Sequence, residues 1–394
     1  MASTKRTEFS GPALFSFGFR PFFLLAGVFA ILIIPLWMLI FGGRLTFNAP
    51  FPTTDWHIHE MLFGYTSAVI TGFLFTAIPN WTGRMPIRGW PLALLAAIWL
   101  AGRLAMIGAL GLGPIGVLLV DCAFLVTFAA IIAREIISGR NWKNLIVLAP
   151  VTVLTLTNIG FHLEVMQTGT SDISRRLGFA VVIFLITLIG GRIIPSFTRN
   201  WMAKQGPGPL PIPFNRFDLF ALIALVFALA LWALLPETLA TGGALFTAAL
   251  LHLIRLSRWR GWLAKSSFLL VMLHLAYLFI PFGLVSLAVG NASLGFHLLG
   301  IGAIGGMTIA VMMRATLGHS GRPLEAGFVL SAAFCLLIAA AFIRGFLAEQ
   351  ALFGLSGLWV ATLVWSLAFA AFIWRVGPWL IRPKTARKLP SKAL

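Results

Sequence analysis

Seven histidines have the residue type and the setting for metal or cofactor chemistry in this 394-residue chain. Neutral imidazole is the commonest nitrogen ligand of haem iron, copper and zinc. Most of these side chains fall within or at the ends of long apolar stretches, where an ionisable group is costly and marks a candidate functional site. They are His57, His59, His162, His252, His274, His297 and His319.

The histidines divide into two layers when each position is converted to depth along an apolar stretch at about 1.5 Å per residue. With the N-terminus in the cytoplasm, one layer lies in the outer third of the bilayer and the other in the inner third. The outer layer holds His57, His59, His162 and His297. The inner layer holds His252, His274 and His319. This layering favours ligation of a metal or haem by at least two of them. The alternative is that single histidines form hydrogen bonds between helices or are solvated.

Two histidines from facing helices can provide both axial ligands of a haem. The preferred outer pair is His59 with His297, because each precedes a Gly-Arg pair at the same spacing, at 83–84 and at 321–322. His57 and His59 point about 200° apart on a regular helix, so they cannot bind one ion together unless the start of the helix is irregular. The inner histidines suit a copper site or a second haem, and spacing alone leaves zinc open.

Acid and base candidates lie beside these ligands. Glu60 follows His57 by three residues and therefore shares its helical face. Tyr277 lies one turn from His274 and is one of only two tyrosines in the chain. We take Glu60 and Tyr277 as the candidate catalytic groups for proton transfer, and His162 as a further cofactor ligand in the outer layer.

Four arginines also fall within apolar stretches, where an unpaired guanidinium is expensive. They are Arg103 at outer depth, Arg192 and Arg314 at inner depth, and Arg375. A bound anion such as a haem propionate suits the planar fork of Arg. The alternative is that these side chains extend to the membrane surface, or bind helix carbonyls and lipid phosphate.

The composition decides what kind of protein must position these residues. Hydrophobic residues make up 59% of the chain and charged residues only 10%, which is too little polar surface for a water-soluble fold. The net charge of +18 would suggest a nucleic-acid partner in a soluble protein. Because the basic residues lie between apolar stretches, they indicate membrane topology instead, and the expected partner is the lipid bilayer.

Twelve stretches are long and apolar enough to cross the membrane as helices. The fold class is therefore all-α, a polytopic membrane protein, with one bundle over residues 20–382 between a segment at 1–19 and a basic tail at 383–394. The expected spans are 20–41, 57–80, 91–110, 113–136, 144–167, 176–199, 215–235, 237–256, 265–288, 291–317, 324–346 and 351–380.

Basic residues in the short loops set the orientation. With the N-terminus inside, most Lys and Arg of these loops are cytoplasmic, and four lie outside: Arg44, Arg175, Arg176 and Arg344. Both termini are then cytoplasmic. No loop is long enough to form a soluble domain, so any chemistry must occur within the bundle or at its faces.

A weak internal repeat suggests how the spans are arranged. The second expected span ends with Ile-Pro-Asn-Trp-Thr-Gly-Arg at 78–84, and the sixth ends with Ile-Pro-Ser-Phe-Thr-Arg at 194–199. The tenth span shares the His-to-Gly-Arg spacing of the second. The copies lie four helices apart, which predicts three four-helix units with pseudo-threefold symmetry.

Four motifs resemble those of the NnrS family, and the resemblance covers nearly the whole chain. They are GFRPFFL at 18–24, HIHEMLFG at 57–64, PNWTGR at 79–84 and RATLGHSGR at 314–322. The resemblance implies a polytopic protein of the bacterial inner membrane that carries haem, here one or two haem b, and copper. It also implies a role in the response to nitric oxide, often alongside denitrification.

The resemblance marks several positions without saying which histidine holds which metal. The family-type positions are His57, His59, Glu60, His162, His252, His274, His297 and His319. The architecture also resembles haem-copper oxidases, which use twelve helices in three arcs with haem ligands on the second and tenth. Their paired histidines on the seventh helix and the His and Tyr pattern of the sixth are missing here, so oxygen reduction and proton pumping are not inferred.

Two functions follow from the residues and the resemblance. The first is a haem- and copper-containing membrane protein that binds or transforms nitric oxide and protects against nitrosative stress. If it reduces nitric oxide, it is a haem-dependent oxidoreductase with an unknown electron donor. The alternative is a transporter, or a metal- or haem-handling protein, with a path lined by His and Arg and no redox turnover.

Overall fold

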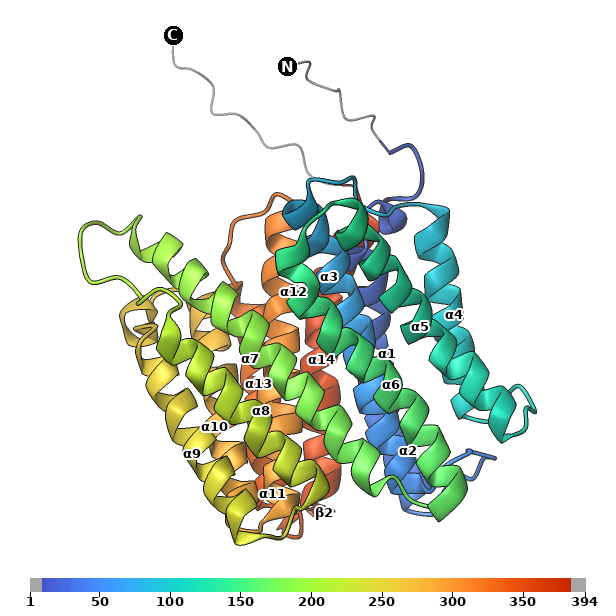
Figure 1. Cartoon of the computed structure of the whole chain (residues 1–394). Coiled ribbons are helices and arrows are strands. Elements are labelled where there is room, and N and C mark those ends of the chain that lie inside the picture. The colour runs from blue at the N-terminus through green and yellow to red at the C-terminus, as the bar shows by residue number, and fades with distance from the viewer. Residues whose placement is uncertain (1–8, 384–394) are drawn as a thin grey trace.

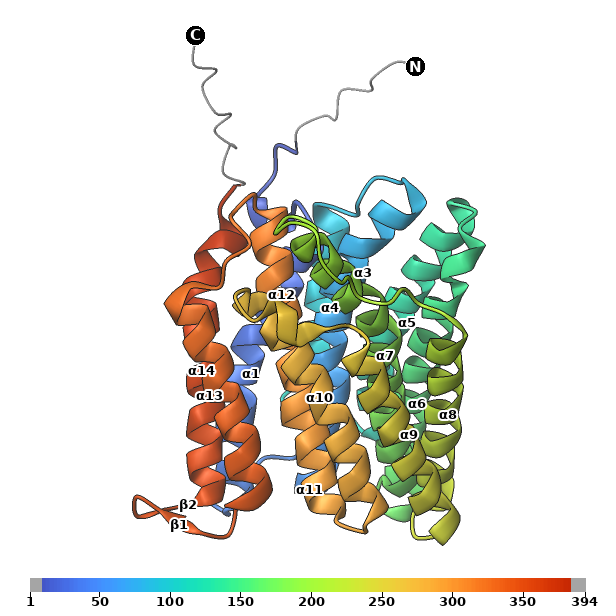
Figure 2. The ribbon, with the colours of Figure 1, turned by 90° about the vertical axis from the view of Figure 1, so that its left-hand side faces the viewer.

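The computed structural model describes residues 9–383 and is helical almost throughout (Figure 1). The helices run up and down as one bundle. Among the described residues the strands are limited to one hairpin, in which Ala351–Leu352 (β1) pairs with Leu355–Ser356 (β2). This hairpin projects at the end of the bundle opposite the one where the described chain begins and ends (Figure 2).

The twelve expected spans all appear as helical rods. Two of them are composite. The second consists of α2 (Thr53–His59), a π-helical segment Glu60–Thr66 and α3 (Ser67–Thr82), and the tenth of α11 (Ala292–His297), a π-helical segment Leu298–Gly305 and α12 (Gly306–His319). The others are α1 (Phe19–Phe41), α4 (Trp90–Met106), α5 (Pro114–Ser138), α6 (Leu145–Thr168), α7 (Asp172–Met202), α8 (Arg216–Leu234), α9 (Leu239–Ser257), α10 (Phe268–Ala288), α13 (Gly327–Phe346) and α14 (Gly357–Ile381).

The rods have the length and composition of membrane helices. In the described part of the chain, 11 are long and apolar enough to cross a bilayer, and α4 is shorter, at 17 residues. Many large apolar side chains on the outside of the bundle are exposed, as a lipid-facing surface requires. The expectation of an all-α polytopic membrane protein is confirmed.

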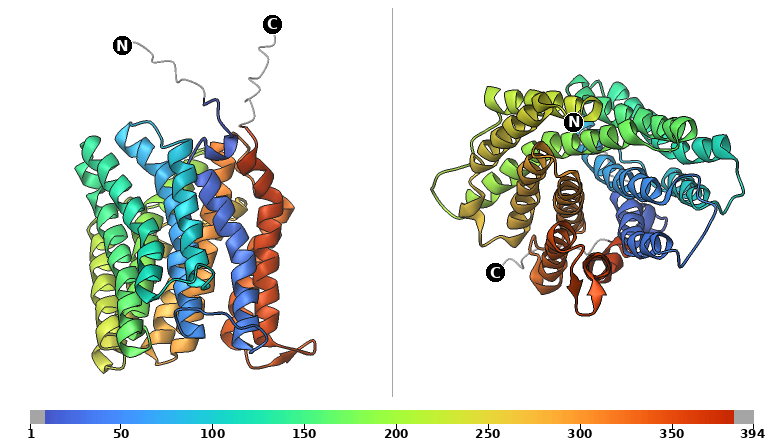
Figure 3. Two further views of the ribbon diagram at one scale, coloured as in Figure 1. Left: turned by 90° about the vertical axis from the view of Figure 1, so that its right-hand side faces the viewer. Right: turned by 90° about the horizontal axis from the view of Figure 1, so that it is seen from below.

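The first and last helices close the bundle (Figure 3). The Arg20 guanidinium of α1 is buried and donates to the carbonyl oxygens of Leu380 and Arg382 at 2.9 and 2.6 Å. Near the middle of α14, the indole of Trp365 donates to the Ala30 carbonyl at 2.8 Å. The described chain therefore begins and ends at the same end of the bundle.

Four spans form the centre of the bundle: the second, α7, α10 and the tenth. In their most apolar windows 78%, 67%, 67% and 72% of residues are buried, whereas α1 and α5 reach only 39%. The second, α7 and the tenth correspond to one another in the predicted repeat and α10 does not, so burial alone does not single out the repeat copies. The likeness to haem-copper oxidases stays a prediction.

The two composite spans each contain one π-helical segment. Each segment begins directly after a histidine, at His59 and at His297. A π-helix pairs each N–H with the carbonyl five residues earlier, which inserts extra residues and turns the following side chains to a new face. The Thr66 hydroxyl follows the same register and donates to the Met61 carbonyl, 2.7 Å away.

The closure at Arg20 is testable through stability. Replacing Arg20 with Leu removes a buried cation and leaves helix-end carbonyls without their donor, so we expect the free energy of unfolding to fall by about 1.5–3 kcal/mol. Thermal unfolding in detergent, followed by tryptophan fluorescence, measures the change. The matched control is Arg44→Leu, since Arg44 is exposed. Equal unfolding temperatures for the two variants would contradict the closure.

Candidate functional site

A cavity of about 320 Å³ lies between α1, the second span, α7, the tenth span, α13 and α14. Its volume falls in the range of roughly 300–1,000 Å³ that cofactor and ligand pockets occupy. Both α2 and α11 lie at the end of the bundle away from the termini (Figure 1). They bring His57 and His297, which are far apart in the sequence, into the lining of this one cavity.

The two histidines of the cavity have ring nitrogens available for a ligand. His57 stacks on Trp37 with ring centroids 4.4 Å apart, and its buried Nδ1 has no hydrogen-bond partner among the described residues. His297 donates from Nδ1 to the Ser293 carbonyl, 2.6 Å away. That tautomer leaves the lone pair on Nε2, as in histidines that bind a metal and use the other nitrogen for orientation.

The cavity is positively charged and otherwise mainly apolar. Arg175 and Arg344 line it, and none of the described residues in its lining is acidic. Arg175 also pairs with Asp172 through one nitrogen. The walls include Trp37 and aromatic rings of α7, the tenth span and α14. Such a lining suits a flat apolar group that carries anionic substituents.

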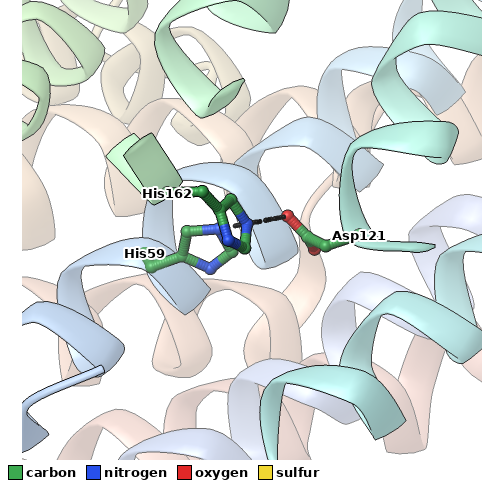
Figure 4. A group of neighbouring side chains, drawn as sticks. All are labelled: His59, Asp121 and His162. Atoms are coloured by element: carbon green, nitrogen blue, oxygen red, sulfur yellow. Dashed lines mark hydrogen bonds and ion pairs between the residues drawn. The ribbon is translucent and has the colours of Figure 1, made fainter. Parts of the chain in front are cut away.

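His59 belongs to a different, acidic cluster. Its Nε2 lies 3.2 Å from Oδ2 of Asp121 on α5, and Nε2 of His162 on α6 lies 3.1 Å from the same oxygen (Figure 4). These three residues, which we call the His59–Asp121–His162 cluster, are buried and offer ligand atoms within 4.8 Å of one another. Over residues 9–383 this is the one such group found.

Arg103 of α4 holds the cluster from one side. It donates to Asp121 and, at 2.5 Å, to Glu60, whose Oε1 lies 3.1 Å from Nδ1 of His59. A Cβ at Gly64 would lie 2.5 Å from Nη1 of Arg103, so glycine is needed there for the guanidinium to fit. Two carboxylates face one guanidinium, which leaves one negative charge that a protonated His59 or a bound cation would balance.

Asn158 completes the same network. Its amide nitrogen donates to Oδ2 of Asp121 at 2.9 Å, and its oxygen lies 2.9 Å from Nε2 of His59. Both ring nitrogens of His59 therefore face oxygen atoms. A neutral ring satisfies one side only, whereas a protonated ring or a ring that binds a metal satisfies the arrangement more fully.

The inner histidines do not gather around one point. His252 pairs its Nδ1 with the Tyr277 hydroxyl at 2.7 Å, and Arg255 donates to that hydroxyl at 3.0 Å and to Asp218 at 2.9 Å. His274, by contrast, bonds to the Leu270 carbonyl within its own helix. We call His252, Tyr277, Arg255 and Asp218 the Tyr277 cluster.

His319 lies apart from that cluster, with its ring 5.6 Å from the ring of Phe19 on α1. Among the described residues, the three inner histidines therefore form no shared metal site. The expected partner of Tyr277 also changes: its hydroxyl bonds to His252 and not to His274.

The four membrane arginines have different surroundings. Arg103 is buried and paired, as above, and Arg314 is half-buried, with its guanidinium 3.8 Å from the centre of the Phe197 ring. Arg192 and Arg375 are exposed on the outside of the bundle, so their positions within apolar stretches do not bury them. Their exposure agrees with the alternative that such side chains extend to the membrane surface or bind lipid phosphate.

Several residues of these sites were missed in the sequence. Asp121 was visible as a lone carboxylate within an apolar stretch, and Asn158 had no such signal. Arg175 and Arg344 were expected in loops on the outer side of the membrane, and Arg255 in a loop on the cytoplasmic side. Only the folded arrangement shows that Arg255 is fully buried and that the other two line a cavity.

Removal of Arg103 tests how strongly the acidic cluster depends on its cation. In an Arg103→Leu variant two buried carboxylates lose their counter-charge, and we expect a loss of about 3–5 kcal/mol in the free energy of unfolding. Thermal unfolding in detergent gives the comparison. The control Arg192→Leu changes an exposed guanidinium of α7 and should stay within about 0.5 kcal/mol. Similar losses in both variants would contradict the network.

The chain matches the family model described as NnrS protein over residues 13–384. A search of the curated proteins found no match. The matched range begins before α1 and ends beyond α14, so it includes the cavity and both clusters. The protein belongs to the NnrS family.

Proposed function

We propose that this protein holds haem b in the cavity lined by His57 and His297, and that it binds or transforms nitric oxide there. Membership of the NnrS family supports a membrane protein of the nitric oxide response. The observation that carries the proposal is the cavity itself, which gathers two histidines and two arginines and has no acidic residue among its described lining.

The residues of the cavity fit a haem on three counts. His57 and His297 would be the iron ligands, since both have a ring nitrogen without a protein partner. Arg175 and Arg344 would bind the propionates, and the aromatic walls would contact the porphyrin. When bound, the haem would supply an iron that binds nitric oxide once one of the two histidines has left it. The chain positions it, neutralises its carboxylates and keeps water away.

This proposal replaces the pair expected from spacing, His59 with His297. Both histidines still stand directly before a π-helical segment, so the repeat is preserved along the chain. Their surroundings differ, because Arg103 and Glu60 hold His59 beside Asp121, whereas His57 lines the cavity. His57, two residues before His59, therefore takes the place that the repeat assigns to His59.

We further propose that the His59–Asp121–His162 cluster is the metal site, with copper as the family-implied ion. Imidazole and carboxylate donors suit Cu(II), Zn(II) and Fe(II), whereas Cu(I) prefers the sulfur of Cys and Met. The uncompensated negative charge of the cluster favours a cation. A protonated His59 without any metal is the competing explanation.

Reduction of nitric oxide would be a further step. It converts two molecules of nitric oxide, two electrons and two protons into nitrous oxide and water, so it needs an electron donor that is still unknown. Glu60 lies beside His59 and is the candidate to hold a proton near the metal. Tyr277 is the second candidate, through its hydrogen bond to His252.

The site of action in this proposal is the bacterial inner membrane, with both termini in the cytoplasm. The start of α1 contacts the end of α14 at one end of the bundle, and this supports termini on one side of the membrane. The histidines of the cavity would then lie in the outer half of the bilayer, where an apolar gas arrives from outside the cell.

The haem assignment predicts which histidine variants change colour. Purified protein should show a haem absorption spectrum that responds to dithionite and to nitric oxide. His57→Ala and His297→Ala should each abolish the low-spin signal, while His59→Ala and His274→Ala should retain it. A stable preparation without haem would contradict the proposal and favour the alternative, a transporter or metal-handling protein without redox turnover.

The metal assignment predicts a separate loss. Asp121→Asn and His162→Ala should each lower the metal content per protein, measured by mass spectrometry of the elements, while the haem spectrum is kept. The control is His252→Ala, which lies in the Tyr277 cluster. An unchanged metal content in the two cluster variants, or no metal in the wild type, would leave a protonated His59 as the explanation.

A further inference from the structure

A second cavity, of about 70 Å³, lies between the second span, α7 and the tenth span. We call it the central pocket. Its lining comes from α3 with the adjoining Thr66, from the middle of α7, and from the first turns of α12. All of these residues are near the middle of membrane spans, at the depth of the hydrocarbon core.

The lining of the central pocket offers nothing for water to bind. It consists of aliphatic, aromatic and Met side chains with one glycine and two threonines. Both hydroxyls are already used within the helices: Thr66 donates to the Met61 carbonyl at 2.7 Å, and Thr308 to the Ile304 carbonyl at 2.7 Å. An apolar cavity without free polar partners stays dry and takes up xenon or other apolar molecules.

The position of the central pocket connects it with two polar sites. Thr66 lines both the central pocket and the larger cavity that contains His57 and His297. On another side, a Cβ at Gly190 would lie 3.7 Å from the ring of Tyr277. The pocket therefore lies between the cofactor cavity and the Tyr277 cluster.

We infer that the central pocket binds a small apolar gas molecule and passes it between the hydrocarbon of the bilayer and the cofactor cavity. Its volume is several times the roughly 10–15 Å³ that a cavity needs to hold one water, so it admits a diatomic gas. Half-buried side chains border the pocket, among them Ile70, Ile189 and Val311. The gas-binding part stands on the pocket alone, and the delivery part rests on the proposed function.

Gly190 allows the pocket to be filled with little disturbance elsewhere. An added Cβ there meets only Ile194, Tyr277 and Met307, at 3.5, 3.7 and 3.9 Å, which are ordinary contact distances. Gly190→Ala therefore narrows the pocket, and Gly190→Leu fills it. The matched control is Gly243→Leu on α9, where an added Cβ meets nothing within 4 Å and the glycine is exposed.

The first test uses xenon, which needs no haem. Crystals of the full chain pressurised with xenon should show an anomalous scattering peak between α3, α7 and α12 in the wild type and in Gly243→Leu. The peak should weaken in Gly190→Ala and vanish in Gly190→Leu. No peak at this place in the wild type would overturn the gas site, as would density for a lipid chain there. If Gly190→Leu fails to fold, the graded loss in Gly190→Ala decides.

The second test measures delivery in protein that carries haem. After flash photolysis of the carbon monoxide adduct, rebinding from solution should slow by about tenfold in Gly190→Leu, the low end of the range over which association rates vary among variants of one site. Gly243→Leu should rebind at the wild-type rate. Unchanged rebinding with the xenon peak lost would overturn the route. A protein without haem would defeat the proposed function, while the xenon test would still decide the pocket.

Discussion

The cost of burying charge between membrane helices is the constraint on which the site depends. Arg103 is neutralised by Asp121 and Glu60, and through them the network joins α4, α5 and the second span, with Asn158 and His162 adding α6. Because this network holds His59, the cavity is left to His57. One set of ion pairs therefore determines which histidine belongs to the acidic cluster and which lines the cavity, and separates an acidic centre from a basic one.

The two centres have opposite charges, and this difference suits different occupants. The cavity with Arg175 and Arg344 favours a group with carboxylates, whereas the His59–Asp121–His162 cluster favours a cation. The second span supplies one histidine to each centre and the tenth span supplies His297 to the cavity, and both spans, with α7, enclose the central pocket. A gas that crosses the bilayer would meet an apolar pocket first and a charged cavity second.

The sequence was sufficient for the fold and insufficient for the pairing of side chains. Length and hydrophobicity of the spans predicted every helix, and counting residues along them placed His57, His59, His162 and His297 in one layer. The repeat then favoured His59 as the partner of His297, because spacing along the chain does not show that Glu60, Asp121 and Asn158 surround the His59 ring. Arg175 and Arg344 looked like ordinary loop charges, since their approach to one cavity comes from α7 and α13, which are distant in the chain.

The most direct test of the central claim is an experimental structure of the purified protein in a lipid nanodisc, by electron cryo-microscopy. The account predicts planar density in the cavity, with its centre reached by His57 and His297 and its edge by Arg175 or Arg344. Planar density ligated by His59, or a cavity filled by side chains or lipid in a preparation that contains haem, would contradict it.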